Sequence, residues 1–114
     1  FFGDNHSFGM TINKLTVYQG AFLEMLISMF LMLTIISVAT NEKISKHIAG
    51  FSIGGIIAVC SFVAGPFTGA SMNPARSIGP AVLANNYNDI VLYLLAPIIG
   101  MLIANYIYNY IKEI

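Results

Sequence analysis

An asparagine, a proline and an arginine stand close together in residues 69–82 (GASMNPARSIGPAV), an otherwise apolar part of the chain. Asn73 can cap a helix with its side-chain oxygen, and Pro74 suits the first helical position. Arg76 follows about one turn later and carries five N–H donors. A helix start also presents unpaired backbone amides and a partial positive charge. The pattern predicts a site that attracts neutral, oxygen-bearing solutes and repels cations and protons.

The same residues have a plainer interpretation. An Asn-Pro pair is a common turn signal, and an arginine near a helix end can extend its side chain to the surface. The apolar flanks argue against this interpretation, because charged residues make up only 9% of the 114 residues. An ionisable side chain inside an apolar span is a functional candidate by default, and Arg76 and Glu24 are the two such residues.

The composition indicates a membrane protein. Hydrophobic residues make up 57% of the chain, the mean hydropathy is +0.78, and five basic residues balance five acidic ones. A soluble domain of this length needs a polar surface that the sequence does not supply, so a bilayer is the expected solvent. The zero net charge gives no reason to expect nucleic acid as a partner. The chain begins at Phe1 without an initiating Met, and we expect a fragment or a processed piece.

Three apolar segments are long enough to cross a bilayer as helices, namely residues 18–39, 48–67 and 90–111. Lysines lie in the turn at 41–47 and near the carboxyl end, so the positive-inside rule predicts that both are cytoplasmic. Residues 1–13 would then form an external loop. We expect an all-α, multi-pass protein of the cell membrane.

The chain between the second and third spans must leave and return on one face. Residues 68–84 are too apolar for a solvated loop, and a helix over 73–84 would be about 18 Å long, roughly half a membrane. We therefore expect a re-entrant half-helix that begins near the midplane, with residues 65–71 (GPFTGAS) entering as extended chain. Backbone of this kind is tolerated only where it packs in protein or lines a watery cavity. The small residues Gly69 and Ala70 would allow close packing.

These features resemble the second half of an aquaporin, a member of the major intrinsic protein family. Residues 71–82 (SMNPARSIGPAV) are similar to the second Asn-Pro-Ala signature of that family and its following arginine. Glu24 in AFLEMLISMFLML matches the glutamate of the fourth family helix, and residues 93–106 (YLLAPIIGMLIANY) match the last helix. The resemblance implies the second inverted repeat of a channel. It also implies a first half with its own Asn-Pro-Ala loop, and a homotetramer.

The resemblance further implies which residues line the pore. Ser61 and Ala70 stand at two filter positions where water-selective members usually carry His and Cys or Thr. Both side chains are small, so Arg76 would face a roomier constriction. The expected pore or substrate-binding residues are Ser61, Gly69, Ala70, Ser71, Met72, Asn73, Pro74, Ala75 and Arg76.

Other positions separate the branches of the family. Ser77 and Ala81 follow the habit of water channels, whereas glycerol facilitators usually have Asp after the arginine. Tyr93 and Leu94 instead resemble the nodulin-like plant proteins and their bacterial relatives. That branch implies passage of water and of glycerol, urea or metalloid acids such as boric or arsenous acid, with ions and protons excluded. A water-selective aquaporin is the alternative.

The resemblance gives Glu24 a supporting role, in which its carboxylate accepts hydrogen bonds from the re-entrant backbone. The plainer alternative is an acid that only packs between helices. Its charged form would need compensation, because burial in a span costs about 2.5 to 3.5 kcal/mol on insertion scales.

Two further function classes remain open from the sequence, a secondary transporter half and a non-conducting interaction module. The transporter would need an ionisable coupling group, and Glu24 is its sole candidate. The chain has no Ser-His-Asp set, metal cluster or phosphate-binding loop, so we expect neither an enzyme nor a cofactor or bound metal. Two small-xxx-small pairs, Gly50 with Gly54 and Gly100 with Ala104, predict helix contacts.

Overall fold

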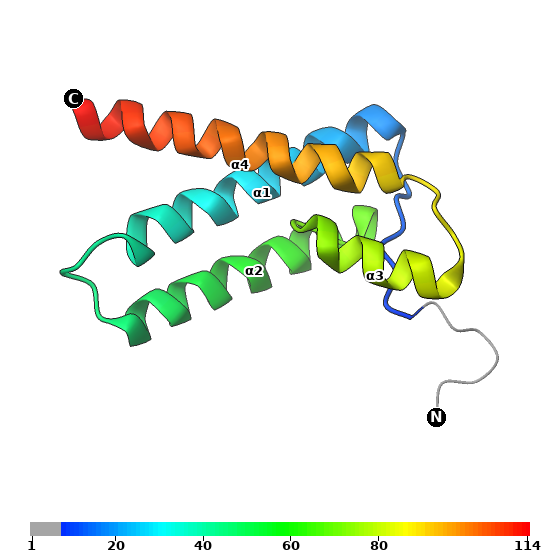
Figure 1. Cartoon of the computed structure of the whole chain (residues 1–114), viewed down its shortest axis with the longest axis horizontal. Helices are drawn as coiled ribbons and strands as arrows, with labels where there is room; N and C mark the ends of the chain where they lie inside the picture. Colours follow the sequence, from blue (N-terminus) through cyan, green and yellow to red (C-terminus); the bar gives the residue numbers. More distant parts are fainter. Residues whose placement is uncertain (1–7) are drawn as a thin grey trace.

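The computed structural model describes residues 8–114, so part of the expected external loop over 1–13 lies outside the described residues. The helices within this range are α1 (Val17–Ala39), α2 (Lys46–Thr68), α3 (Pro74–Ala84) and α4 (Ile90–Glu113). Helices α1, α2 and α4 are long and apolar enough to cross a membrane. They run along the long axis of the molecule, whereas α3 occupies only one part of its length (Figure 1). The fold class is the expected one, with three spanning helices and a re-entrant half-helix.

Local capping explains where the first two long helices begin. Thr16 and Gln19 form a capping box. The backbone N–H of Gln19 donates to the Thr16 hydroxyl, and the backbone N–H of Thr16 donates to the side-chain oxygen of Gln19. Ser45 caps α2 by accepting a 3.4 Å hydrogen bond from the amide of Ile48. Helix α2 therefore begins at Lys46, two residues before the expected span. Hydropathy does not detect these two residues because their side chains are polar.

The end of α2 differs from the expectation. Residues 65–71 were expected as extended chain, which is wrong, because α2 continues through Pro66 to Thr68. Proline removes one helical N–H donor, and membrane helices tolerate this loss where neighbouring groups compensate. Gly69 ends the helix with φ of +80° and donates its amide to the carbonyl of Gly65 at 3.0 Å.

Helix α1 lies between α2 and α4, and α3 packs against α4. The contact of α1 with α4 is very close at Gly100, where an added Cβ would overlap the carbonyl oxygen of Met25. Ala104, one turn further, is fully buried. This pair therefore forms the expected helix contact. Gly50 and Gly54 have no atom within 4 Å of a Cβ built at either position, so that pair makes no such contact within residues 8–114.

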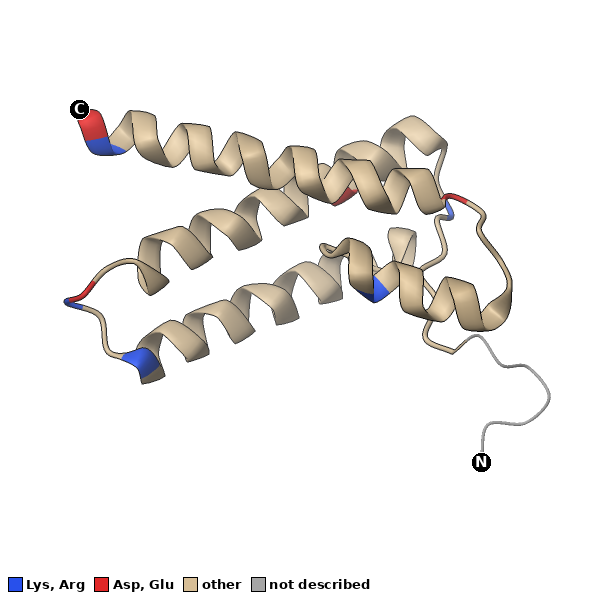
Figure 2. Ribbon diagram, in the orientation of Figure 1, with Lys and Arg blue, Asp and Glu red and all other residues tan. Residues whose placement is uncertain are grey.

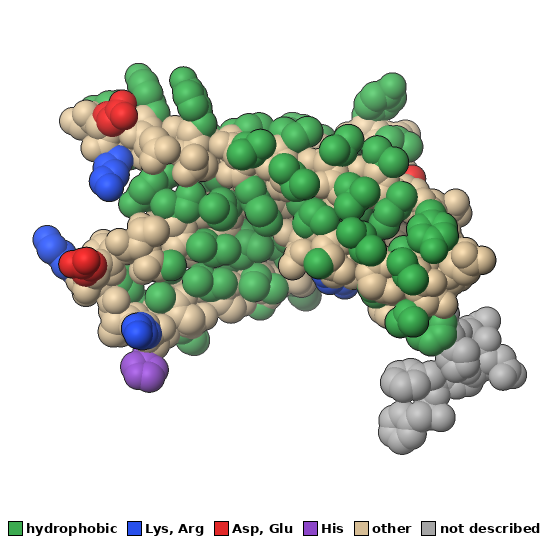
Figure 3. Space-filling view, viewed as in Figure 1, with side chains coloured by type: hydrophobic (Ala, Val, Ile, Leu, Met, Phe, Trp, Pro, Cys, Tyr) green, Lys and Arg blue, Asp and Glu red, His purple; other side chains and the backbone are tan. Residues whose placement is uncertain are grey.

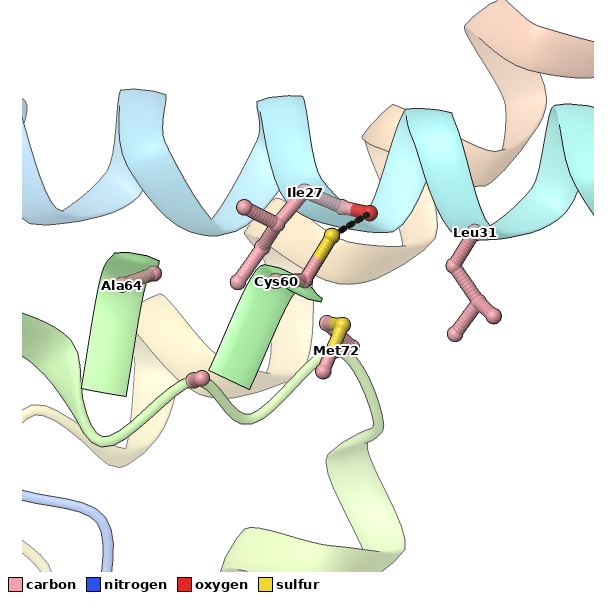
Figure 4. Packing of buried hydrophobic residues seen from close by; sticks show 6 residues of the cluster. Ile27, Leu31, Cys60, Ala64 and Met72 are labelled. Carbon is pink, nitrogen blue, oxygen red and sulfur yellow. Dashed lines mark hydrogen bonds between the residues drawn. The ribbon is translucent and has the colours of Figure 1, made fainter. Parts of the chain in front are cut away.

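The small core joins the re-entrant segment to α1 and α2. Met72 lies beside Cys60 of α2, on the side towards Leu31 of α1, and Ile27 and Ala64 belong to the same buried cluster (Figure 4). Apolar side chains also cover much of the outer surface between the two ends of the molecule (Figure 3). Exposure of large apolar side chains on this scale suits a surface that faces lipid or other membrane helices.

Candidate functional site

The chain turns back into the helix bundle over residues 69–72. Ala70 and Met72 have φ of 45° and 53°, in the left-handed region that non-glycine residues rarely adopt. The buried carboxylate of Glu24 accepts hydrogen bonds from two successive amides, those of Ser71 and Met72, each at 2.9 Å. These charge-assisted bonds stabilise the unusual backbone and satisfy a carboxylate that has no contact with water. The hydrogen bonds that the resemblance implied for Glu24 are present.

Two residues that the sequence did not single out for this role complete the support. Thr68 donates its hydroxyl to Glu24 at 2.6 Å, and the same hydroxyl oxygen accepts a 3.3 Å bond from the amide of Ala70. Tyr93 of α4 donates its hydroxyl to the carbonyl of Thr68 at 2.6 Å. Helices α1, α2 and α4 thus all contribute to one buried network that fixes the turn. Thr68 and Tyr93 are less than 2% exposed, as is Glu24, so these bonds are shielded from competing water.

The short helix that follows begins as the sequence predicts. The side-chain oxygen of Asn73 accepts a 2.9 Å hydrogen bond from the amide of Ala75, and Pro74 is the first helical residue. Helix α3 has 11 residues and is about 16 Å long. Within residues 8–114 the side-chain amide nitrogen of Asn73 has no protein partner, so it can donate to a solute.

A hollow of about 390 Å³ brings most of the expected pore residues together. Ile57 lies eleven residues after Lys46 and eleven before Thr68, and it shares this hollow with Asn73. The amino end of α3 is therefore level with the middle of a spanning helix. The lining residues are Leu31, Ile35, Ile57, Ser61, Ala70, Ser71, Met72, Asn73, Arg76 and Met101.

Some expected pore residues do not line the hollow, and some residues that line it were not expected. Gly69, Pro74 and Ala75 are not among the lining residues, because the first ends α2 and the other two begin α3. Leu31 and Ile35 of α1 are additional wall residues that the sequence reasoning missed. They follow Glu24 by seven and eleven residues, about two and three helical turns, and this spacing on one helix face was the available signal. Met101 had no comparable signal.

Arg76 is the cationic group of the hollow. Its Nη1 donates to the carbonyl of Gly9 at 3.2 Å, and the side chain is otherwise exposed. Figure 2 shows the charged positions gathered at the two ends of the molecule, apart from one acidic position in α1 and one basic position in α3, which are Glu24 and Arg76. Residues 8–114 contain no group of three His, Cys, Asp or Glu side chains that could hold a metal ion.

A bundle of apolar spanning helices, with a half-helix that begins at mid-span beside a hollow of apolar walls and a few polar groups, defines a membrane protein with a re-entrant segment. The model of the major intrinsic protein family matches residues 3–108. Nodulin-26 of Glycine max is 38% identical over 112 residues, which are 98% of this chain and 41% of that protein. A probable aquaporin NIP-type of Nicotiana alata is 45% identical over 95 residues, 83% of this chain and 35% of that protein.

Aquaporin NIP6-1 of Arabidopsis thaliana is 41% identical over 104 residues, which are 91% of this chain and 34% of that protein. The chain belongs to the major intrinsic protein family and is a multi-pass membrane protein. It spans between 34% and 41% of the length of these three relatives.

Proposed function

We propose that this chain forms the second half of a passive channel for small neutral solutes. The observation that carries the proposal is the shared hollow of Ser61, Asn73 and Arg76 at the middle of α2. Fixed hydrogen-bond donors and a positive charge beside an apolar wall are the elements from which aquaporin-type selectivity is built.

The mechanism follows from the two faces of the hollow. A solute oxygen can accept from the amide nitrogen of Asn73 and then from the free N–H groups of Arg76, one turn away along α3. Leu31, Ile35 and Ile57 offer only apolar contacts on the facing walls, where Ser61 of α2 adds one hydroxyl, so most hydrogen-bond partners of a solute lie on the α3 side. The guanidinium and the amino end of α3 both repel cations and protons.

The small filter side chains favour solutes larger than water. Ser61 and Ala70 leave the space beside Arg76 open where a histidine would fill part of it. We therefore assign glycerol, urea and metalloid acids such as boric or arsenous acid, besides water, as the substrate class. The likeness to nodulin-26 and to aquaporins of the NIP type supports this assignment. Strict water selectivity is the alternative within the channel class.

A complete pore requires a first half, on the same polypeptide or on a second chain. Ser61, Asn73 and Arg76 are all exposed in the chain alone, so one side of the hollow has no wall. The first half would supply that wall and its own Asn-Pro-Ala loop, and four such pores would assemble as a homotetramer in the bilayer. The turn between α1 and α2 and the carboxyl end would face the cytoplasm, because both carry lysines.

The buried network argues against a secondary transporter. Such a transporter needs an ionisable coupling group at the solute site. Glu24 is fully buried, already accepts three hydrogen bonds and does not line the hollow. It therefore acts as a support for the backbone, and among the described residues 8–114 no acid lines the hollow for ion coupling.

Stopped-flow measurement of proteoliposomes under a glycerol gradient tests the function. Vesicles that hold the chain assembled with its first half should shrink and then reswell faster than empty vesicles. Ile57→Trp should block this flux because the indole fills the hollow, whereas Phe51→Trp, at a position of α2 that is 85% exposed, should not. Saturable, ion-dependent uptake would favour a transporter, and no flux would favour a non-conducting interaction module.

A further inference from the structure

The segment that precedes α1 crosses the turn between α2 and α3. We call residues 9–14 the tether. The amide of Lys14 donates to the carbonyl of Phe67 at 2.8 Å, which fixes one end of the tether to the last turn of α2. Further along, a Cβ added to Gly69 would lie 3.0 Å from the Cα of Thr11, so the tether touches the turn directly. The tether therefore packs on the backbone that carries the half-helix.

A chain of three hydroxyl groups links the tether to the start of α3. The hydroxyl oxygens of Thr11 and Ser77 are 2.7 Å apart, those of Ser77 and Ser71 are 2.6 Å apart, and Ser71 donates to the carbonyl of Asn73 at 2.8 Å. The three side chains are 1–4% exposed, so water is not an alternative partner.

The donor and acceptor in each hydrogen bond of this hydroxyl series follow from the number of protons available. Each hydroxyl has one proton to donate. Ser71 donates its proton to the carbonyl of Asn73, so Ser77 must be the donor to Ser71. Thr11 must then be the donor to Ser77. The direction is therefore fixed from Thr11 to the cap of α3, and loss of the Thr11 hydroxyl removes the first donor of the series.

The tether also holds the guanidinium. Gly9, two residues before Thr11, accepts a 3.2 Å hydrogen bond from Nη1 of Arg76, and Ser77 is the next residue to Arg76 in α3. A closed ring results, in which the Thr11 side chain anchors the tether to α3 and the Gly9 carbonyl restrains the arginine. If the anchor is lost, the Gly9 carbonyl is free to move away, and the guanidinium, which already lines the hollow, can move further into it.

We propose that Thr11 is a positioning residue for Arg76 and thereby a determinant of solute selectivity. This inference rests on the proposed channel function for its effect on selectivity, but the effect on Arg76 itself does not depend on conduction. Thr11→Val keeps the shape of the side chain and removes the donor. The loss of one hydrogen bond in such a network corresponds to a change of roughly two- to tenfold in an equilibrium or a rate.

The experiment uses the chain assembled with its first half in proteoliposomes. Modification by phenylglyoxal, a reagent for arginine, is followed at Arg76 by mass spectrometry of the peptide. Thr11→Val should raise the modification rate roughly two- to tenfold, because the guanidinium is released from Gly9. The ratio of glycerol to water permeability should fall by a similar factor, because a guanidinium that reaches further into the hollow obstructs the larger solute more.

Matched variants exclude a general loss of structure. Thr34→Val removes a hydroxyl that bonds only the carbonyl of Phe30 in its own helix, and it should change neither readout. Thr11→Ser keeps the donor, so its Arg76 modification rate and its glycerol-to-water ratio should lie close to the wild-type values. Ser77→Ala removes the acceptor of the same bond and should act like Thr11→Val, which provides a second test if the latter assembles poorly.

The outcomes separate this inference from the channel proposal. An unchanged modification rate in Thr11→Val and Ser77→Ala overturns the positioning role, whatever the flux. A faster rate with an unchanged or higher glycerol-to-water ratio overturns the role in selectivity. Wild-type vesicles without glycerol flux contradict the proposed function, and the modification rates still decide whether Thr11 holds Arg76.

Discussion

Thr68, the last residue of α2, donates its hydroxyl to the carboxylate of Glu24 in the middle of the buried network. The contact joins residues 44 positions apart, and it fixes the point where α2 ends against α1. The carboxylate thus receives one hydroxyl from the end of α2 and two amides from the turn that follows. A single acid therefore sets both the place at which the spanning helix stops and the direction in which the chain re-enters.

Glu24→Gln should keep the fold but loosen the re-entrant turn. The amide group of glutamine has one acceptor oxygen, and its NH₂ would face a backbone N–H that now has no acceptor. A buried donor left unpaired costs about 1 to 3 kcal/mol. We expect a lower thermal unfolding temperature in detergent and faster hydrogen exchange at the amides of Ser71 and Met72.

The control for that variant is Glu42→Gln, which neutralises an exposed acid in the turn between α1 and α2. It should leave both readouts unchanged. Wild-type exchange rates and stability in Glu24→Gln would mean that the carboxylate only packs between helices.

Gly100→Ala tests the close approach of α4 to α1. The added methyl group would overlap the carbonyl oxygen of Met25, and backbone at that position has little room to move. Overpacking of this kind costs about 1 to 3 kcal/mol. Thermal unfolding in detergent should show a clear loss for Gly100→Ala and none for Gly54→Ala, where an added Cβ meets no atom within 4 Å.

Hydropathy and length were sufficient to predict the fold class, because three long apolar segments in a short chain have few arrangements in a bilayer. The helix ends were less accessible. Lys46 and His47 are polar and yet helical, since Ser45 caps the turn that contains them. The extended chain expected over 65–71 was wrong, because α2 continues through Pro66 to Thr68 and Gly69 caps it.

The site was predictable as far as its residues are local in sequence. Asn73, Pro74 and Arg76 belong to one helix start, and their spacing defines their relative positions. The tether was not predictable, because Thr11 meets Ser77 across 66 positions and a lone threonine in a loop has no periodic pattern. The left-handed backbone of Ala70 was equally hidden, since alanine carries no sequence signal for positive φ.

Arg76→Val should weaken the exclusion of protons and cations. Within residues 8–114 the guanidinium is the one side-chain charge that lines the hollow, so its loss leaves there the partial charge at the amino end of α3. A unit charge at about 6 Å in partly buried surroundings changes a cation barrier by about 2 to 3 kcal/mol. Proton leak, measured with a pH dye in vesicles that hold the chain with its first half, should rise at least roughly tenfold.

The matched variant is Lys43→Val, which removes an exposed charge in the turn between α1 and α2 and should leave the proton leak unchanged. An equal leak in wild type and Arg76→Val would show that the barrier to protons lies elsewhere in the pore.

Ser61→His should narrow the hollow beside Arg76 and so reduce the passage of solutes larger than water. Ser61 lines the same hollow as Arg76 and Ala70, so an imidazole at this position would enter the space beside the guanidinium. Extra volume in a confined site costs about 1 to 3 kcal/mol for a solute that must displace it, which is about five- to 150-fold in rate. Glycerol permeability should therefore fall by at least about fivefold in stopped-flow light scattering, whereas water permeability should be retained.

Ser52→His provides the comparison on the same helix. The Ser52 hydroxyl bonds the carbonyl of Ile48 in its own helix at 2.9 Å, and Ser52 is not among the residues that line the hollow. This variant should conduct glycerol as the wild type does. If Ser61→His also conducts glycerol at the wild-type rate, Ser61 does not lie at the constriction, and the roomier filter must be assigned to other residues of the assembled pore.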